Sequence, residues 1–228
     1  WEGNKHKPDK LIIVHEQGLG DSFQFCRFLA KVPNSIKKIF CGPKKLHGLL
    51  IQSGLIKHCM DPSEKGFSWN LKNFSGEDSW IPLMSLAHLL QNSKNFNYQE
   101  NPYLITRQLY IDNWSVLLTK NRNPIVAIHW QGNPDHEVTL SRGRSFPLKT
   151  LEPLLDIKGI SWLSLQKGPG SEQVDQRSIR HQLHTAQQAV EECWDFEQTA
   201  AILMNCDLVI TSDSGLAHLA AGLGRPTW

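Results

Sequence analysis

The sequence has no hydrophobic run long enough to cross a membrane. Its longest apolar runs, such as residues 11–14 and 208–210, are far shorter than the roughly 20 residues that a spanning helix needs. The start of the chain also lacks the apolar core of a signal peptide. Neither sign of charge dominates, because 24 Lys and Arg stand against 22 Asp and Glu. These absences exclude a membrane-embedded protein, and the charge balance gives no reason to expect a nucleic-acid partner.

Common catalytic and metal-binding motifs are missing as well. The ten histidines form neither H-x-x-x-H nor H-E-x-x-H, and no G-x-S-x-G elbow of a serine hydrolase is present. The first glycine turn has Phe23 where the dinucleotide fingerprint needs a third glycine, and it lacks the Gly-Lys-Ser/Thr ending of a P-loop. Five cysteines without a C-x-x-C pair predict free, mostly buried thiols in a reducing compartment. We therefore predict no metal site and no cofactor.

What is present is the composition of a globular α/β protein. The 228 residues, 40% hydrophobic and 20% charged, allow one large domain or two small ones at about 150 residues per domain. Short β-branched apolar segments alternate with amphipathic helical ones, which favours parallel sheets with right-handed crossovers. Residues 120–124 have the composition of a linker, so we predict domains at residues 1–122 and 123–228. Strands are expected near residues 10–15, 38–41, 54–59, 125–130, 160–165 and 207–211, and helices near 22–31, 44–51, 111–120, 148–155, 196–205 and 215–222.

The two ends of the chain suggest a longer protein. The sequence begins at Trp1 without a methionine, and residues 225–228 lead out of the last predicted helix toward what should be another strand. We therefore expect a processed, trimmed or partial copy of a longer chain, with an incomplete C-terminal sheet.

The first candidate site is the glycine turn that follows the first predicted strand. Gly18 and Gly20 allow the backbone to approach a ligand, and Asp21 would place a carboxylate beside it. A carboxylate at that point can take a proton from an attacking hydroxyl. The alternative is an ordinary strand-to-helix turn in which Asp21 is the N-cap residue.

Two further candidate loops follow predicted strands of the second domain. In the loop after residues 125–130, Trp130 and Gly132 are followed by Arg142 and Arg144, which are suited to clamping an anion. The alternative is a solvated basic loop. In the loop after residues 160–165, Lys167 would meet ribose or phosphate oxygens, or would be a surface lysine in a flexible loop.

The fourth candidate is the turn that opens the last predicted helix. Ser214 and Gly215 would present donors, together with the free N–H groups of the first helical turn, to a diphosphate. His218 lies one turn further along, and Asp213 is better suited to sugar hydroxyls than to a phosphate of like charge. The alternative is a well-capped helix with His218 packed in the core.

At these loops the sequence resembles a known family. It is similar to the glycosyltransferase family 9-like domain, which is related to the ADP-heptose:lipopolysaccharide heptosyltransferases. The closest likeness is to the version at the C-terminus of bacterial tetratricopeptide-repeat proteins. Each stretch is weak alone, but seven in order are specific. The stretches that carry the resemblance are residues 16–25, 82–86, 128–134, 144–148, 164–170, 195–200 and 212–219.

The resemblance implies a GT-B fold, in which two Rossmann-like domains with mainly parallel sheets face a cleft. The acceptor would bind the N-terminal domain, and the nucleotide-sugar the C-terminal one. It also implies inverting, metal-independent transfer of a hexosyl or heptosyl group from a nucleotide-diphosphate donor to an acceptor hydroxyl, with Asp21 as general base. The residues that it implies for donor and diphosphate binding are Arg144, Lys167, Asp213, Ser214, Gly215 and His218, with Gly18, Gly20, Trp130, Gly132 and Gln166 as additional contacts.

The partners follow from the same resemblance. They are a nucleotide-diphosphate sugar, a glycan, lipid-linked or protein acceptor, and tetratricopeptide repeats elsewhere in the full-length protein, with no nucleic acid. The location implied is the cytoplasm, with peripheral contact at the inner membrane face. The alternative function is a non-catalytic nucleotide-sugar-binding or scaffold module.

Overall fold

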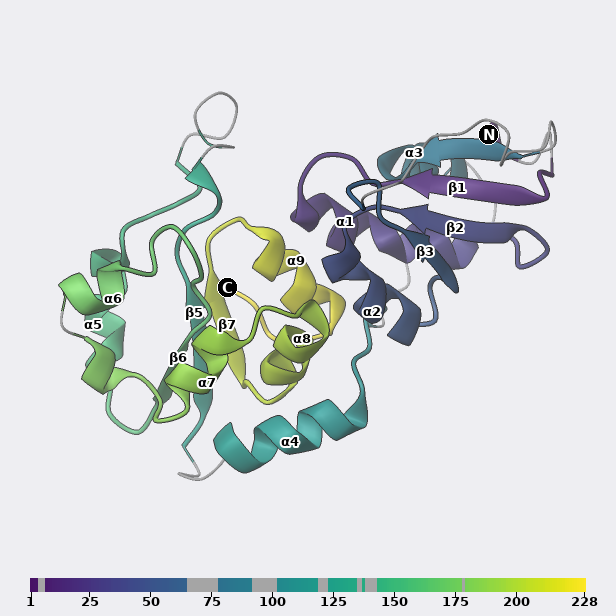
Figure 1. Cartoon of the computed structure of the whole chain (residues 1–228). Coiled ribbons are helices and arrows are strands. Elements are labelled where there is room, and N and C mark those ends of the chain that lie inside the picture. Colours follow the sequence, from purple (N-terminus) through teal and green to yellow (C-terminus); the bar gives the residue numbers. More distant parts are fainter. Residues whose placement is uncertain are drawn as a thin grey trace. The chain divides into compact units, whose positions relative to one another are not determined.

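The chain forms two compact units, each built around its own parallel sheet. The computed structural model describes residues 1–3, 7–64, 78–91, 102–118, 123–134, 137, 143–177 and 179–228. The units are Trp1–Ile105 and Thr106–Trp228, with one sheet in each (Figure 1). The predicted α/β class with mainly parallel sheets is confirmed.

The sheet of the first unit is buried at its centre. Leu11, Ile12 and Ile13 of the central strand are at most 1% exposed, which is why this strand reads as a continuous apolar run rather than an alternating one. All pairs are parallel, and Ile12 lies opposite Ile39 on one side and Trp80 on the other. The strand order is β3-β2-β1-β4, with β1 Lys10–Val14, β2 Lys37–Cys41, β3 His58–Met60 and β4 Ser79–Pro82.

Helices alternate with strands in the first unit, as predicted, but β4 and helix α3 are not among the expected elements. The single helix predicted near residues 22–31 is in fact helix α1 followed by a 3-10 helix. Helix α2 buries Leu46, Leu49 and Leu50, which the helical period places on one face. The elements are α1 Leu19–Phe25, the 3-10 helix Cys26–Lys31, α2 Lys44–Gln52 and α3 Leu83–Gln91. All five cysteines are free, and three of them are buried: Cys26, Cys41 and Cys206.

The sheet of the second unit has the order β6-β5-β7 and is also parallel. Its strands are β5 Ile125–His129, β6 Ser161–Ser164 and β7 Leu208–Thr211. Beyond β7, Val209 forms a parallel bridge with Thr227, so residues 225–228 begin the further pairing that the sequence predicts at this edge. Trp130, Leu148 and Trp162 pack in the core of this unit.

Helix α8 begins where its capping pattern predicts. The carboxylate of Asp195 accepts hydrogen bonds from the N–H groups of Glu197 at 2.6 Å and Gln198 at 3.3 Å. The elements of this unit are α4 Gln108–Leu118, the 3-10 helix Leu148–Thr150, α5 Glu152–Leu155, α6 Gln173–Gln176, the 3-10 helix Arg180–Gln182, α7 Gln187–Glu192, α8 Phe196–Met204 and α9 Gly215–Gly222.

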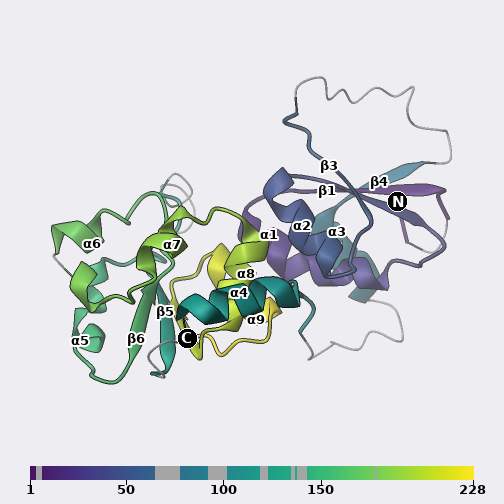
Figure 2. The ribbon, with the colours of Figure 1, turned by 60° about the horizontal axis from the view of Figure 1, so that its bottom comes forward.

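The division between the units lies before the predicted boundary at residues 122 and 123, because helix α4 packs against α8 (Figure 2). The Trp114 indole N–H donates to the side-chain oxygen of Gln198 at 2.8 Å. The side-chain amide of Asn205 donates to the carbonyl of Ile111 at 3.0 Å. A linker composition marks a loop, but the side chains of α4 decide which unit the helix joins. The acceptor and donor roles of the two domains stay predictions.

Candidate active site

In the first unit, Asp21 is held by the glycine turn. Gly18, rather than Asp21, is the N-cap residue of α1, and Asp21 is the third residue of the helix. Its Oδ2 accepts a hydrogen bond from the Gly18 N–H at 2.8 Å. A Cβ on Gly18 would lie 3.3 Å from this oxygen, so glycine leaves room for the contact. Gly20 lies in the same first turn, and the half-buried carboxylate of Asp21 therefore has a defined orientation.

A histidine that the sequence analysis missed lies beside Asp21. The Nδ1 atom of His15 is 2.6 Å from the Ser22 hydroxyl, within one hydrogen bond. Burial lowers the pKa of His15, the negative charge of Asp21 partly opposes this shift, and Lys45 adds to it. Hydrogen bonds therefore fix the turn between His15 and Asp21 at both ends, and the titratable imidazole of His15 lies near the Asp21 carboxylate.

In the second unit, Arg144 faces a carboxylate that was not predicted. The Nε atom of Arg144 is 3.6 Å from Oε1 of Glu137. The same carboxylate accepts a bond from the Ser145 hydroxyl, which in turn accepts from the Gly132 N–H at 2.9 Å. The side chain of Arg144 is 26% exposed, so it lies partly buried at the surface and not in a fully solvated loop. Arg142 lies outside the described residues.

Gln166 has a structural role instead of a side-chain contact to ligand. Its oxygen accepts from the N–H groups of Trp130 at 3.2 Å and Gln131 at 3.0 Å. Its amide donates to the carbonyls of Gln131 at 3.0 Å and Pro169 at 2.8 Å. All four hydrogen-bonding positions of the amide are used. Trp130 is fully buried. The side chains of Trp130 and Gln166 are therefore not available for the predicted contacts with a nucleotide-sugar.

Replacing Gln166 with Leu should therefore destabilise the second unit. The change leaves two N–H groups and two carbonyls without their partner in a site where Gln166 is 3% exposed. We expect a loss of about 3 kcal/mol or more in the free energy of unfolding, measured by urea denaturation. Gln188 is an exposed glutamine of α7, and Gln188→Leu should stay within about 0.5 kcal/mol. An equally small effect of both changes would contradict this role.

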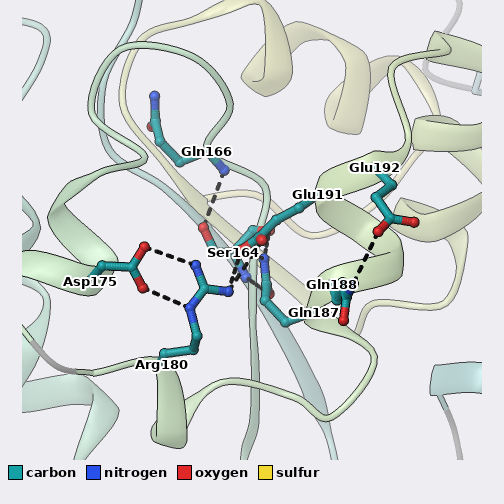
Figure 3. Close-up of polar contacts among 8 residues, drawn as sticks. All are labelled: Ser164, Gln166, Asp175, Arg180, Gln187, Gln188, Glu191 and Glu192. Atoms are coloured by element: carbon teal, nitrogen blue, oxygen red, sulfur yellow. Dashed lines mark hydrogen bonds and ion pairs between the residues drawn. The ribbon is translucent and has the colours of Figure 1, made fainter.

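Lys167 is one of the residues that line a pocket of about 230 Å³. Within the described part of the chain its Nζ has no hydrogen-bond partner, and it lies 5.3 Å from the centre of the Trp194 ring. Burial lowers the pKa of Lys167, and Cys193 and Glu191 partly oppose the shift. Arg180, between Asp175 and Glu191, forms one wall (Figure 3). The predicted loop cation is thus held in place with unused hydrogen-bonding capacity.

The turn before α9 brings Ser214 to a second histidine that was not predicted. The Ser214 hydroxyl lies 3.3 Å from Nδ1 of His129 and 3.3 Å from the Thr211 hydroxyl. Burial lowers the pKa of His129 to about 4, so this imidazole is neutral at physiological pH. Asp213 is exposed, and Gly215 begins the helix. His218 is half-buried, so it is not the core histidine of the alternative.

The three loops of the second unit meet at one edge of its sheet. Parallel strands end at the same edge, and the bonds of Gln166 and His129 join the loop after β5 to those after β6 and β7. Arg144, Lys167 and the start of α9 therefore share this edge, whereas Asp21 belongs to the first unit.

Some of the missed residues had a recognisable signal in the sequence. His15 and His129 each come directly after the apolar run of a strand and directly before a loop with Gln and Gly. Polar residues at the carboxyl ends of parallel strands are candidates for a site on position alone. Glu137 had no such signal, because its contact with Arg144 spans a loop.

Within the ranges given above, no group of three or more His, Cys, Asp or Glu could hold a metal ion. None of the helices in those ranges has the length and apolarity to cross a membrane.

Solved structures define the class of this fold. It resembles the glycosyl transferase family 9 protein of Veillonella parvula, with a TM-score of 0.69 and 12% identity over 99% of this chain and 82% of that one. It resembles E. coli ADP-heptose LPS heptosyltransferase II, with a TM-score of 0.62 and 15% identity over 96% and 83%. For E. coli heptosyltransferase WaaC with ADP, the TM-score is 0.60 and the identity 13%, over 96% and 86%. The fold is the GT-B fold of these glycosyltransferases.

Sequence comparison points to the same family. Residues 163–227 match the model of "Glycosyltransferase family 9 (heptosyltransferase)". Protein FlbA of Caulobacter vibrioides is 22% identical over an alignment of 245 residues, gaps included. The alignment covers 99% of this chain and 40% of FlbA. This chain thus spans less than half of that relative. The family match agrees with the predicted resemblance to the glycosyltransferase family 9-like domain over residues 163–227.

Proposed function

We propose that the chain transfers a sugar from a nucleotide-diphosphate donor to an acceptor hydroxyl, with inversion and without a bound metal. The observation that carries the proposal is the shared edge of the second sheet. Two cations, Arg144 and Lys167, and the uncapped start of α9 each lie in a loop that follows a strand at this edge. These groups suit the charge that develops on a departing nucleoside diphosphate.

In the proposed reaction, Asp21 takes the proton of the acceptor hydroxyl. The hydroxyl oxygen forms a bond to the anomeric carbon of the donor sugar from the face opposite the leaving group. The bond between that carbon and the diphosphate oxygen breaks, and its electron pair leaves with the nucleoside diphosphate. Arg144, Lys167 and the N–H groups at Ser214 and Gly215 stabilise this negative charge, with Asp213 and His218 beside the donor sugar and diphosphate.

A second candidate function is donor binding without transfer. One observation favours it: the Asp21 carboxylate already accepts a bond from the Gly18 N–H, as a purely structural residue would. In this case the second unit would bind the nucleotide as proposed, and Asp21 would take no proton.

A thermal-shift screen with ADP, GDP and UDP tests the donor site. E. coli heptosyltransferase WaaC has been solved with ADP and with ADP-2-deoxy-2-fluoro heptose, so ADP is the first ligand to test. At 100 times its Kd, a ligand that binds only the folded protein stabilises it by about 2.7 kcal/mol, which raises Tm by about 5–10 °C. EDTA should leave the shift unchanged. The absence of a shift with all three diphosphates would contradict the proposal.

A further inference from the structure

The residue at the N-cap of α9 does not cap its helix. A serine at this position usually accepts a hydrogen bond from the second or third N–H of the helix. Ser214 has the extended backbone of an N-cap residue, with φ of −147° and ψ of 173°, yet its side chain makes no such bond. The hydroxyl lies instead 3.3 Å from Nδ1 of His129. A common stabilising contact is therefore absent at the start of α9.

His129 is suited to hold the Ser214 hydroxyl in this place. It is the last residue of β5, where it pairs with Thr211 of β7, and its carbonyl accepts from the Ser212 N–H at 3.0 Å. The Thr211 hydroxyl, which also lies 3.3 Å from Nδ1, donates to the carbonyl of Ser212 at 2.9 Å. The hydroxyl proton of Thr211 is thus already used. When Nδ1 carries no proton, it therefore accepts from the Ser214 hydroxyl; when it carries one, it can donate to the oxygen of either hydroxyl.

A second observation in the same turn points to a ligand. Ser212 is 4% exposed, and its hydroxyl has no hydrogen-bond partner in the part of the chain that the structure describes. Buried hydroxyls are usually bonded. The turn thus contains an unpaired hydroxyl and, next to it, a helix start from which the capping side chain is turned away.

We propose that His129 is a positioning residue, which holds the Ser214 hydroxyl away from the first turn of α9 and so keeps the N–H group of Leu216 open for the donor diphosphate. The inference rests on the proposed function of this site. It assigns to His129 an indirect role, because the imidazole acts through Ser214. The protein gives up a helix cap, and the ligand takes the place of that cap.

Two amides of different reach test the proposal. The amide of Asn occupies the place of the imidazole Nδ1, so His129→Asn should hold Ser214 and keep the Kd for ADP within about twofold. The longer side chain of Gln replaces Nε2 instead. In His129→Gln the Ser214 hydroxyl can turn back and cap the helix, which should raise the Kd for ADP about tenfold, as expected for one lost charge-assisted hydrogen bond. Isothermal titration calorimetry measures both values.

Ser214→Ala separates positioning from a merely structural role. Without the hydroxyl there is no cap to form, so adding His129→Gln to Ser214→Ala should change the Kd by less than about twofold. An equal loss from His129→Gln with and without the Ser214 hydroxyl would overturn the proposal. So would equal Kd values for His129→Asn and His129→Gln.

A measurement without ligand keeps this test apart from the proposed function. Hydrogen exchange at the amide of Leu216 should slow in His129→Gln, where the serine caps it, and should stay fast in the wild type and in His129→Gln/Ser214→Ala. The amide of Ala217 already donates to the carbonyl of Ser214 at 3.1 Å and is the internal reference. If the wild type binds no nucleoside diphosphate, the proposed function fails, yet exchange still reports whether His129 controls the cap. Unchanged exchange in His129→Gln would reject the inference while leaving the donor site in place.

Discussion

Replacing Asp21 with Asn should lower turnover by about 10²–10⁴-fold, the usual contribution of a general base. The amide has the size of the carboxylate but almost no basicity. Its oxygen can still accept the hydrogen bond from the Gly18 N–H, so the glycine turn and Tm should be preserved. The Kd for ADP, measured by calorimetry, should stay within about threefold, because Asp21 does not belong to the proposed donor site.

Glu16 offers a matched control for Asp21→Asn. It lies in the same turn, and its carboxylate accepts a bond from the Met84 N–H at 3.3 Å. Glu16→Gln removes one negative charge from the turn and keeps an acceptor, and it should leave turnover within about threefold. If both variants lose turnover equally, or if neither does, Asp21 is a helix-stabilising residue and the module binds its donor without transfer.

Replacing Arg144 with Ala should affect binding and rate together. A guanidinium that contacts the diphosphate does so in the ground state and in the transition state, so both KM and kcat should change. We expect kcat/KM to fall by about 10²–10³-fold and the Kd for ADP to rise at least about tenfold. The loss is enlarged because the Glu137 carboxylate, 3.6 Å from Arg144 Nε, is left without its cation and repels the donor.

Two further variants separate this role from a general effect of charge. Arg177 pairs with Glu152 at the surface of the same unit, at 2.9 Å, and Arg177→Ala should leave the Kd for ADP within about twofold. Glu137→Gln added to Arg144→Ala should recover part of the lost affinity by removing the repulsion. If Arg144→Ala leaves the Kd for ADP unchanged, Arg144 serves only its pair with Glu137.

Much of the fold could be predicted from local patterns. A continuous apolar run predicts strand β1, because a strand that is buried on both faces needs no polar side chain. Leucines at helical spacing predict helix α2, and the capping residue Asp195 predicts the start of α8. These signals involve residues within one or two turns of each other. The same local rules place each candidate loop at the end of a strand.

The sequence by itself determined the two parallel sheets, six of their strands, and the loops in which Asp21, Arg144, Lys167 and Ser214 lie. Only the tertiary structure decided what those side chains meet. The side-chain amide of Gln166 bonds to the backbone of Gln131, 35 residues away in the sequence. His129 contacts Ser214, which is 85 residues away in the sequence. Helix α4 joins the second unit through contacts with α8 that lie as many as 94 residues apart. The physical reason is that hydrogen bonds and packing depend on which strands become neighbours, and no local pattern of residues records that choice.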